Sequence, residues 1–278
     1  MRWVTVYQAM DEEEPAAAHQ AALTYSSYLA LDQVLNAQHP RSEEHDEMLF
    51  IVIHQVYELW FKQLLHELGH LQRSLEAGAT PRALGTLKRI LTILKTVVAQ
   101  VDVLETMTPR QFSAFRSRLD AASGFQSAQF REIVAVLGGR DPRAAVGYSD
   151  GSGARTRIAD AATRRSLFDS YLVYLSTQGY GVPEAALGRD VGAPLQPSGA
   201  VQDVVLRAYT DDGDAAQVSE RMLDLDEGMQ EWRYRHVKMV ERTIGDKRGT
   251  GGSSGVEYLR RSLFQPAFPD LWAVRSRI

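Results

Sequence analysis

The residues best suited to chemistry lie in one apolar stretch, DEMLFIVIHQVYELWFKQLLHELGH, which covers residues 46–70. Its first histidine, His54, stands among aromatic and aliphatic neighbours that would bury an imidazole. The stretch ends in the pattern H-E-x-x-H, formed by His66, Glu67 and His70. In that spacing, two histidines on one helical face bind zinc while the glutamate activates a water molecule. The same stretch therefore fits two chemistries, one built on a buried single histidine and one on a zinc ion.

The zinc pattern is short, and helices rich in Glu and His produce it by chance. Gly69 weakens the helix between the two histidines. Arg73 and Glu76 stand where the longer zinc-protease signature has Gly and His. Glu76 could still serve as a third zinc ligand. A zinc hydrolase that uses residues 66–70 is therefore kept as an alternative.

A further histidine, His236, lies on an apolar helical stripe with Trp232 four residues before it and Val240 four residues after it. A lone histidine on such a face is usually a core residue whose ring finds a backbone partner. Two of them on separate long helices are more informative, because opposed helices can hold a planar cofactor. One histidine would then bind iron and the other would face the open coordination position. The pair of His54 and His236 therefore favours a haem site, although both histidines could still be ordinary core residues.

Two further segments have residue types that bind anions. Arg116 follows Phe112 and Phe115, and an arginine between aromatic residues suits recognition of a carboxylate in an apolar pocket. The loop at residues 245–255 is rich in glycine and contains Thr250, so its backbone amides could surround an anion. It lacks the spacing of a nucleotide-binding loop and follows a helix. A linker or a lid over a ligand is the alternative.

Helices must position these residues, because strand-like alternation is nearly absent and apolar residues recur at helical spacing. We expect helices at about residues 23–35, 42–75, 81–107, from 109 to before 123, around 130–134, 167–175, 218–244 and from 256. The sequence predicts an all-α fold, a bundle of long helices in a single domain over residues 21–278. Residues 1–20 are predicted to be a mobile, acidic arm. Residues 138–198 are predicted to be a variable excursion of helix and loop.

Composition limits the functional classes. The chain has 278 residues, 44% of them hydrophobic and 24% charged, as in globular proteins, and its net charge of −4 predicts no nucleic-acid partner. No apolar run approaches the roughly 20 residues that cross a membrane, and acidic residues occupy the region where a signal peptide is apolar. There is no cysteine, which excludes disulfides, thiolate nucleophiles, iron–sulfur clusters and cysteine-ligated haem. We therefore expect a cytoplasmic protein with no membrane partner.

Five segments, spread in order from about residue 23 to residue 260, together resemble the tryptophan 2,3-dioxygenase family. They are LTYSSYLALDQVLNAQHP, HDEMLFIVIHQVYELWFKQLLHEL, ETMTPRQFSAFRSRLDAASGFQSAQFR, WRYRHVKMV and GDKRGTGGSSGVEYL. Five matching blocks are far more specific than any single motif. The resemblance implies an all-α protein that encloses a b-type haem and assembles as a homotetramer.

The resemblance also assigns roles to individual residues. His236 would be the proximal ligand of the haem iron, and His54 would lie on the distal side near the indole nitrogen of the substrate. Arg116 would pair with the substrate carboxylate, assisted by Thr250, which together with a haem propionate would hold the ammonium group. The remaining expected contacts are Phe50, Leu119, Ser123 and Gly124 in the pocket, the last two also against the haem, and Tyr25, Tyr28 and Leu29 in the site of the neighbouring subunit.

The implied reaction inserts both atoms of dioxygen across the bond between carbons 2 and 3 of the indole ring of L-tryptophan. It uses ferrous haem and gives N-formyl-L-kynurenine. Ser26 stands where the family usually has glycine, and Asp246 replaces an apolar or small residue. The sequence also allows a related haem monooxygenase that inserts one oxygen atom into a tryptophan derivative. An interaction protein without turnover is a further alternative.

Overall fold

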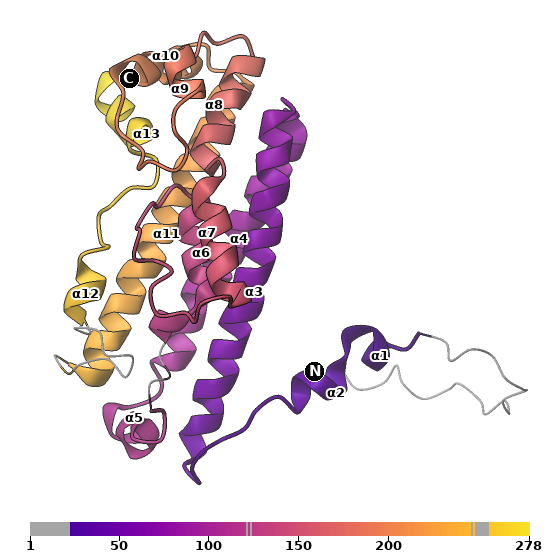
Figure 1. The fold of residues 1–278 in the computed structure, drawn as a ribbon, viewed down its shortest axis with the longest axis vertical. Coiled ribbons are helices and arrows are strands. Elements are labelled where there is room, and N and C mark those ends of the chain that lie inside the picture. The colour runs from indigo at the N-terminus through magenta and orange to yellow at the C-terminus, as the bar shows by residue number, and fades with distance from the viewer. Residues whose placement is uncertain (1–22, 121, 123, 246, 248–255) are drawn as a thin grey trace, which may run out of the picture. The chain divides into compact units, whose positions relative to one another are not determined.

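The structure is a computed structural model that describes residues 23–120, 122, 124–245, 247 and 256–278. Contacts divide the chain into two compact units, Met1–His39 and Pro40–Ile278. Within the described ranges every regular element is a helix, and no strand occurs (Figure 1). This confirms the predicted all-α fold. The predicted arm at residues 1–20 lies outside the described residues.

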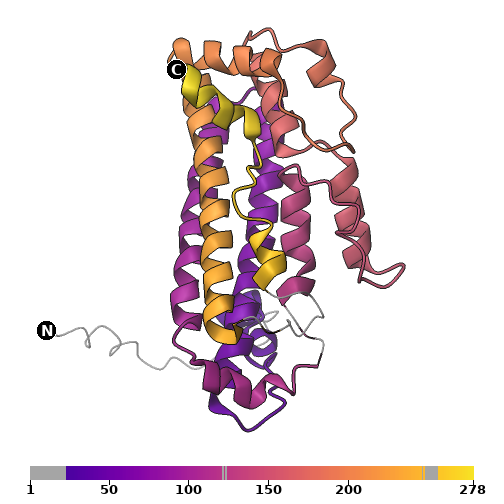
Figure 2. The same ribbon diagram turned by 90° about the vertical axis from the view of Figure 1, so that its left-hand side faces the viewer.

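Three long helices form the frame of the second unit: α3 (His45–Glu76), α4 (Thr80–Leu104) and α11 (Asp214–Ile244). α4 packs against both α3 and α11, and the three run alongside one another (Figure 2). Pro81 lies in the first turn of α4, where its missing amide hydrogen costs no helical hydrogen bond. Apolar residues recur along α4 at intervals of three and four and are buried, including Leu87, Leu94 and Val101. The packing of this stripe explains why α4 is a long, regular helix.

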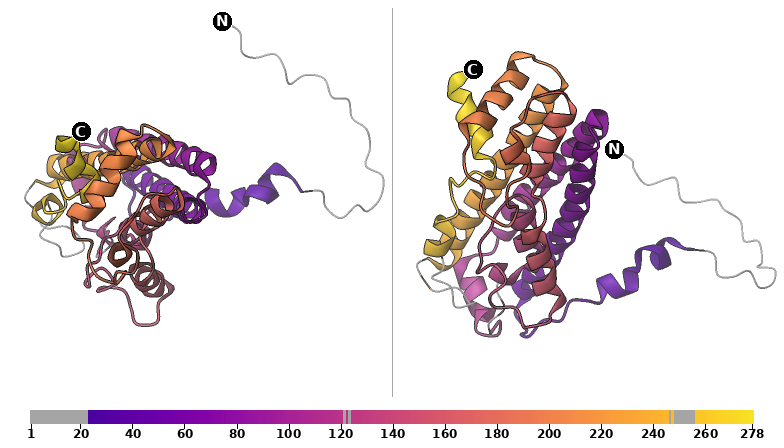
Figure 3. Two further views of the ribbon diagram at one scale, coloured as in Figure 1. Left: turned by 90° about the horizontal axis from the view of Figure 1, so that it is seen from above. Right: turned by 45° about the horizontal axis from the view of Figure 1, so that its top comes forward.

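The shorter helices surround this frame. They are α5 (Pro109–Arg116), α6 (Ala128–Val136), α7 (Gly153–Thr163), α8 (Leu167–Thr177), α9 (Glu184–Leu187), α10 (Gly199–Thr210), α12 (Val256–Arg260) and α13 (Pro269–Ala273), with 3₁₀ turns at Gly124–Gln126 and Val274–Arg277. α6 and α8 pack against α3, and α7 packs on α6. Seen along the bundle, α6 and α7 lie on one side of the long helices (Figure 3). Helices α7 and α10 were not expected from the sequence.

The short helices begin at side chains that cap them. Ser127, Ser152, Ser166 and Ser198 each accept a hydrogen bond from the backbone amide three residues later, at the starts of α6, α7, α8 and α10. Thr108 does the same for α5, and the side-chain oxygen of Gln111 in turn accepts a hydrogen bond from the backbone amide of Thr108. Local capping therefore fixes where α5 starts, just after the end of α4.

The main core fills the space among α3, α4, α8, α10 and α11. Leu71, Leu75 and Tyr171 are fully buried within it. The hydroxyl groups of Tyr171 and Ser219 lie 2.6 Å apart and join α8 to α11. Replacing a buried leucine of this kind by alanine typically costs about 2–5 kcal/mol. This core holds one half of the bundle rigid, and a smaller apolar cluster around Ile53 and Phe115 occupies the other half.

A buried carboxylate of α11 holds the start of the C-terminal segment, and Glu220 of the same helix pairs with Arg275 further along it. Asp226, in the middle of α11, is almost completely buried. Its Oδ2 accepts hydrogen bonds from the backbone amide of Phe268 at 3.0 Å and from the indole Nε1 of Trp272 at 2.9 Å. Its Oδ1 accepts a bond from Gln230 at 3.2 Å. A buried carboxylate that accepts three hydrogen bonds is well satisfied.

The first unit contains two short helices, α1 (Tyr25–Leu29) and α2 (Leu31–Leu35). Thr24 and Ser27 form a capping box at the start of α1. Neither helix buries any of its residues; Tyr25 is 76% exposed and Tyr28 is 71% exposed. These helices therefore have no core of their own. No helix in the described part of the chain has the length and apolar character needed to cross a membrane.

Candidate active site

The second unit encloses a cavity of about 1100 Å³. Its walls come from α3, α4, α5, α6, α7, α11, the start of the α6–α7 loop and the segment that begins in α12. Ligand pockets are usually roughly 300–1,000 Å³ in volume. The cavity therefore has room for a large cofactor and a small substrate together. His54, Arg116 and His236 all line it, so the fold brings together three residues that lie far apart in the sequence.

His54 lies on α3 and presents one ring nitrogen for chemistry. Its Nδ1 lies 2.7 Å from the backbone oxygen of Phe50, one turn earlier. A carbonyl oxygen only accepts hydrogen bonds, so Nδ1 carries the hydrogen and Nε2 carries the lone pair. Burial lowers the pKa of His54, although the bond to Phe50 and the nearby Glu58 oppose this. The imidazole is therefore neutral near pH 7, and a side chain added at Gly124 would approach Nε2 to 3.9 Å.

His236 lies on α11 and faces the same cavity. Burial, together with the nearby His54, lowers its pKa to about 4. Among the described residues, neither ring nitrogen of His236 has a hydrogen-bond partner. Its ring stacks on Trp232, with centroids 5.2 Å apart and planes within 4° of parallel. His236 therefore offers a neutral nitrogen donor that no described protein group competes for.

The wall around His54 is aromatic. The rings of Phe50, Phe112 and Phe115 lie with centroids 5.4–5.7 Å apart, in tilted and edge-to-face contacts. Arg116 follows Phe115 at the end of α5, is partly buried and lines the cavity, as does Leu119. A cation thus stands at the edge of a wall that would otherwise suit only an apolar ligand.

Five further arginines line the cavity: Arg131, Arg140, Arg143, Arg233 and Arg261. They come from α6, the α6–α7 loop, α11 and the segment after α12. Arg233 is partly buried, and burial lowers the pKa of its guanidinium, an effect that Asp226 opposes. Sequence reasoning missed all five, because they belong to no common motif. The cavity therefore joins apolar walls to several cationic groups, a combination suited to an apolar ligand with anionic substituents.

A model of the tryptophan 2,3-dioxygenase family matches residues 10–168 and 196–278, which is most of the chain. The chain belongs to the tryptophan 2,3-dioxygenase family. The resemblance seen in the sequence is thereby confirmed. The unmatched residues between these two ranges, 169–195, fall within the segment expected to vary most, and residues 1–9 are also unmatched.

Named relatives agree with the family assignment. A tryptophan 2,3-dioxygenase of Anaeromyxobacter sp. (strain K) is 66% identical over 262 residues, covering 94% of this chain and 98% of the relative. One from Herpetosiphon aurantiacus is 57% identical, covering 92% of this chain and 98% of the relative. One from Bacillus thuringiensis subsp. konkukian is 40% identical, covering 92% of this chain and 93% of the relative. The similarity thus extends over nearly the whole length of each protein.

The structure places some of the family's expected site residues and leaves others undescribed. Phe50, Leu119 and Gly124 line the cavity together with the two histidines and Arg116. Ser123, Thr250 and Asp246 lie outside the described residues. Tyr25, Tyr28 and Leu29 belong to the first unit, where they are exposed. Their expected contacts with a neighbouring subunit stay a prediction.

The H-E-x-x-H pattern has a structural role in this family member. Glu67 is buried, and both of its carboxylate oxygens accept from Arg89 of α4 at 3.2 Å. Gln63 donates to the same carboxylate at 2.8 Å, and His66 is exposed. Glu76 accepts from Ser170 at 2.8 Å. No group of three metal-binding side chains occurs in the described residues, so the zinc-hydrolase alternative finds no support.

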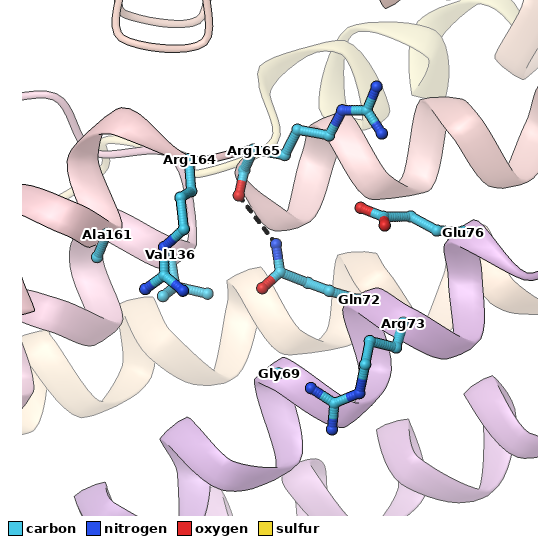
Figure 4. Close-up of a pocket in the computed structure, with 8 residues that line it drawn as sticks. All are labelled: Gly69, Gln72, Arg73, Glu76, Val136, Ala161, Arg164 and Arg165. Atoms are coloured by element: carbon cyan, nitrogen blue, oxygen red, sulfur yellow. Dashed lines mark hydrogen bonds between the residues drawn. The ribbon is translucent and has the colours of Figure 1, made fainter.

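A second pocket, of about 290 Å³, lies beside the end of α3 (Figure 4). Gln72 bridges it by donating to the backbone oxygen of Arg165 at 2.9 Å. The guanidinium groups of Arg73, Arg164 and Arg165 point in different directions, and the carboxylate of Glu76 lies at its edge. These groups do not converge on one point, so the pocket lacks the arrangement that would recognise a single ligand.

Proposed function

We propose that this protein is a haem-dependent dioxygenase that cleaves the indole ring of L-tryptophan to N-formyl-L-kynurenine, with dioxygen as co-substrate. The observation that carries the proposal is the pair of neutral imidazoles, His54 and His236, facing one cavity in a chain of the tryptophan 2,3-dioxygenase family. The family membership supports the reaction. The cavity supports the positions of the groups that would perform it.

The residues present fit a b-type haem. The chain has no cysteine, so a covalent thioether attachment is ruled out and the haem would be held by coordination and packing. His236 would supply a nitrogen ligand to the iron, because its low pKa keeps the lone pair free and no described group competes for it. Apolar walls suit the porphyrin ring, and the arginines suit its carboxylates. When bound, ferrous haem supplies dioxygen binding and the activation that indole oxidation requires.

The chain's own residues would bind and orient the substrate. The guanidinium of Arg116 would pair with the α-carboxylate, and the planar geometry of both groups would set the direction of the amino acid. Phe50 and Leu119 provide an apolar surface for the indole ring. Fixing both ends in this way removes much of the entropy cost of reaching the reactive arrangement. On the basis of the resemblance, Thr250 would add contacts to the charged end.

His54 would hold the indole N–H. Its Nδ1–H is committed to the Phe50 carbonyl, so only Nε2 is free and it can only accept a hydrogen bond. The indole N–H is a donor that matches this acceptor. Because burial lowers the pKa of His54, the residue is a weak base. We therefore assign it a positioning role, with any proton transfer secondary to that role.

The homotetramer predicted from the resemblance is consistent with the first unit, whose helices bury none of their own residues. Tyr25, Tyr28 and Leu29 would be covered when the chain assembles. Sedimentation equilibrium of the full chain and of a Tyr25→Ser, Tyr28→Ser variant tests this. The expected result is a tetramer that the double substitution weakens. The cytoplasmic location likewise stays a prediction.

The decisive experiment combines variants with product analysis. His236→Ala should abolish the normal Soret band of the reconstituted protein, whereas His54→Ala should retain haem and turn over more slowly. His66→Ala removes an exposed histidine from α3 and serves as the control for both readouts. With isotopically labelled dioxygen, the wild type should incorporate both labelled atoms into N-formylkynurenine.

Two outcomes would contradict the proposal in different places. An unchanged Soret spectrum in His236→Ala would show that another residue binds the iron. Incorporation of a single labelled oxygen atom would replace dioxygenation by the related monooxygenase reaction on a tryptophan derivative.

A further inference from the structure

Trp232 is the aromatic neighbour of His236 and lies one turn before it on α11. The two rings are within 4° of parallel, with centroids 5.2 Å apart. Trp232 is only 9% exposed and contributes to the cavity wall. The residue that offers a nitrogen to the cavity is therefore stacked on a large ring that has little freedom to move.

The contacts of His236 differ from those of most metal-binding histidines. Such histidines usually donate their second ring N–H to a carboxylate, a carbonyl or a water, which fixes the tautomer and the rotation of the ring. In the part of the chain that the structure describes, His236 has no protein acceptor for either nitrogen. The carboxylates nearest along the chain are Glu231 and Glu241, each five residues from His236; Glu231 is exposed, and Glu241 pairs with Lys238 and Arg260. The rotation of the imidazole must therefore be set by packing.

Packing from two other helices holds the indole of Trp232 in place. Phe130 of α6 lies with its ring centroid 4.6 Å away, tilted by 40°. Phe61 of α3 meets it edge to face, at 6.0 Å and 84°. The indole Nε1 is buried and has no hydrogen-bond partner in the described structure. Packing without a hydrogen bond therefore fixes the plane of Trp232, the two ring contacts among it, and its stacking passes that plane on to His236.

We propose that Trp232 is the positioning residue for His236, setting the plane of the imidazole by stacking in place of a hydrogen-bonded acceptor. The inference rests on the proposed function, because it takes His236 to be the haem ligand. An aromatic contact of this kind favours the stacked arrangement roughly 2- to 12-fold. With no protein carboxylate on its second nitrogen, the imidazole acts as an ordinary neutral ligand.

The test compares ring-keeping and ring-removing variants of the haem-loaded full chain. Trp232→Phe keeps an aromatic face beside His236, and Trp232→Leu removes it. Trp60 of α3 is the matched control, because its indole nitrogen is also buried without a partner and it does not line the cavity. The readouts are the iron–histidine stretching band of the ferrous protein and the electron-paramagnetic-resonance anisotropy of the ferric cyanide complex. Both respond to the imidazole plane.

The expected result is specific to Trp232. Trp232→Leu should broaden or shift the iron–histidine band and change the anisotropy, whereas Trp232→Phe should restore most of the wild-type signal. Trp60→Leu, which also removes a partly buried indole, should leave both spectra unchanged. A Trp232→Leu protein with wild-type spectra would overturn the proposal, as would a Trp60→Leu protein with equally altered spectra.

Failure of the inference is separable from failure of the proposed function. If His236→Ala keeps the wild-type haem spectrum, His236 is not the ligand and the proposed function fails at that point. If His236→Ala loses the wild-type haem spectrum but Trp232→Leu keeps it, only the positioning role fails.

If Trp232→Leu does not load haem, nuclear magnetic resonance of the apoprotein provides the test. The carbon-bound ring protons of His236 should be shifted upfield by the indole in the wild type, and unshifted protons would overturn the proposal.

Discussion

Acid should destabilise the apoprotein through His236 in a defined pH window. The folded protein holds this imidazole at a pKa of about 4, against its usual 6.5, because the ring is buried. Above the usual value both folded and unfolded chains leave it neutral, and its full contribution to stability is present. As the pH falls from about 6.5 to about 4, the unfolded chain binds a proton that the folded chain does not. Stability is therefore lost across this window.

The magnitude follows from the size of the shift. A difference of about 2.5 pKa units corresponds to about 3 kcal/mol of unfolding free energy. This is an upper limit, because water that enters the cavity reduces the cost of charging the ring. The lowered pKa of His54 acts in the same direction, so the total loss in the wild type is larger than the part due to His236.

Urea unfolding followed by far-ultraviolet circular dichroism measures this loss. The comparison is between the wild type and His236→Phe, which keeps a ring against Trp232 and cannot titrate. Subtracting the two stability curves cancels the contribution of the other histidines, and the difference contains the titration of His236 together with its charge coupling to His54. The difference should change by up to about 3 kcal/mol between about pH 6.5 and about pH 4, and should be flat above that window. A difference that stays flat throughout would refute the burial of His236 as the cause.

Three further predictions follow from the described contacts. Arg116→Leu should raise KM for L-tryptophan roughly 10- to 150-fold, because a charged hydrogen bond to the substrate is lost, while the haem spectrum stays unchanged. A fall in kcat of that size with KM unchanged would argue against carboxylate recognition by Arg116. Asp226→Ala should lower the free energy of unfolding by about 3–5 kcal/mol in urea titrations, since the amide of Phe268 and the indole nitrogen of Trp272 lose their acceptor; a loss within about 0.5 kcal/mol would show that this attachment contributes little. Glu67→Gln should cost about 1–3 kcal/mol of stability and leave the activity of the haem-loaded enzyme intact, whereas a selective loss of activity would revive a chemical role for the H-E-x-x-H pattern.

The long helices could be predicted because their apolar periodicity is strong. The last of them was expected at about residues 218–244 and is found at Asp214–Ile244, with the stripe that carries His236 facing inward. The helices at Gly153–Thr163 and Gly199–Thr210 were missed. The first has few large apolar residues and lies in the stretch 138–198, whose glycine, proline and serine content suggested loops, whereas the second begins just after that stretch, where no helix was expected. Their serine caps were the signal that could have found them.

The candidate site could be predicted only in part. His54 and His236 stood out because each lies among apolar residues on a long helix, although their shared cavity depends on tertiary packing. Arg131 and Arg140 reach the cavity because of where α6 ends, which no local pattern encodes. From the sequence, Trp232 could be predicted only as a core residue, and its stacking parallel to the ring of His236 could not be predicted. Its orientation follows from Phe61 and Phe130, which lie far away in the chain.

The position of α4 between the two histidine-bearing helices has a consequence for how the site can change. α3 carries His54, α11 carries His236, and each packs against α4. The gap across which the two imidazoles act is therefore fixed by a helix that contributes only apolar side chains to the cavity, Val101 and Leu104. α4 therefore acts as a spacer between α3 and α11, and bulkier or smaller residues along it should change the width of the cavity without altering a polar lining group. If the cavity holds the substrate as proposed, substitutions at Val101 and Leu104 should change the size of ligand that it accepts.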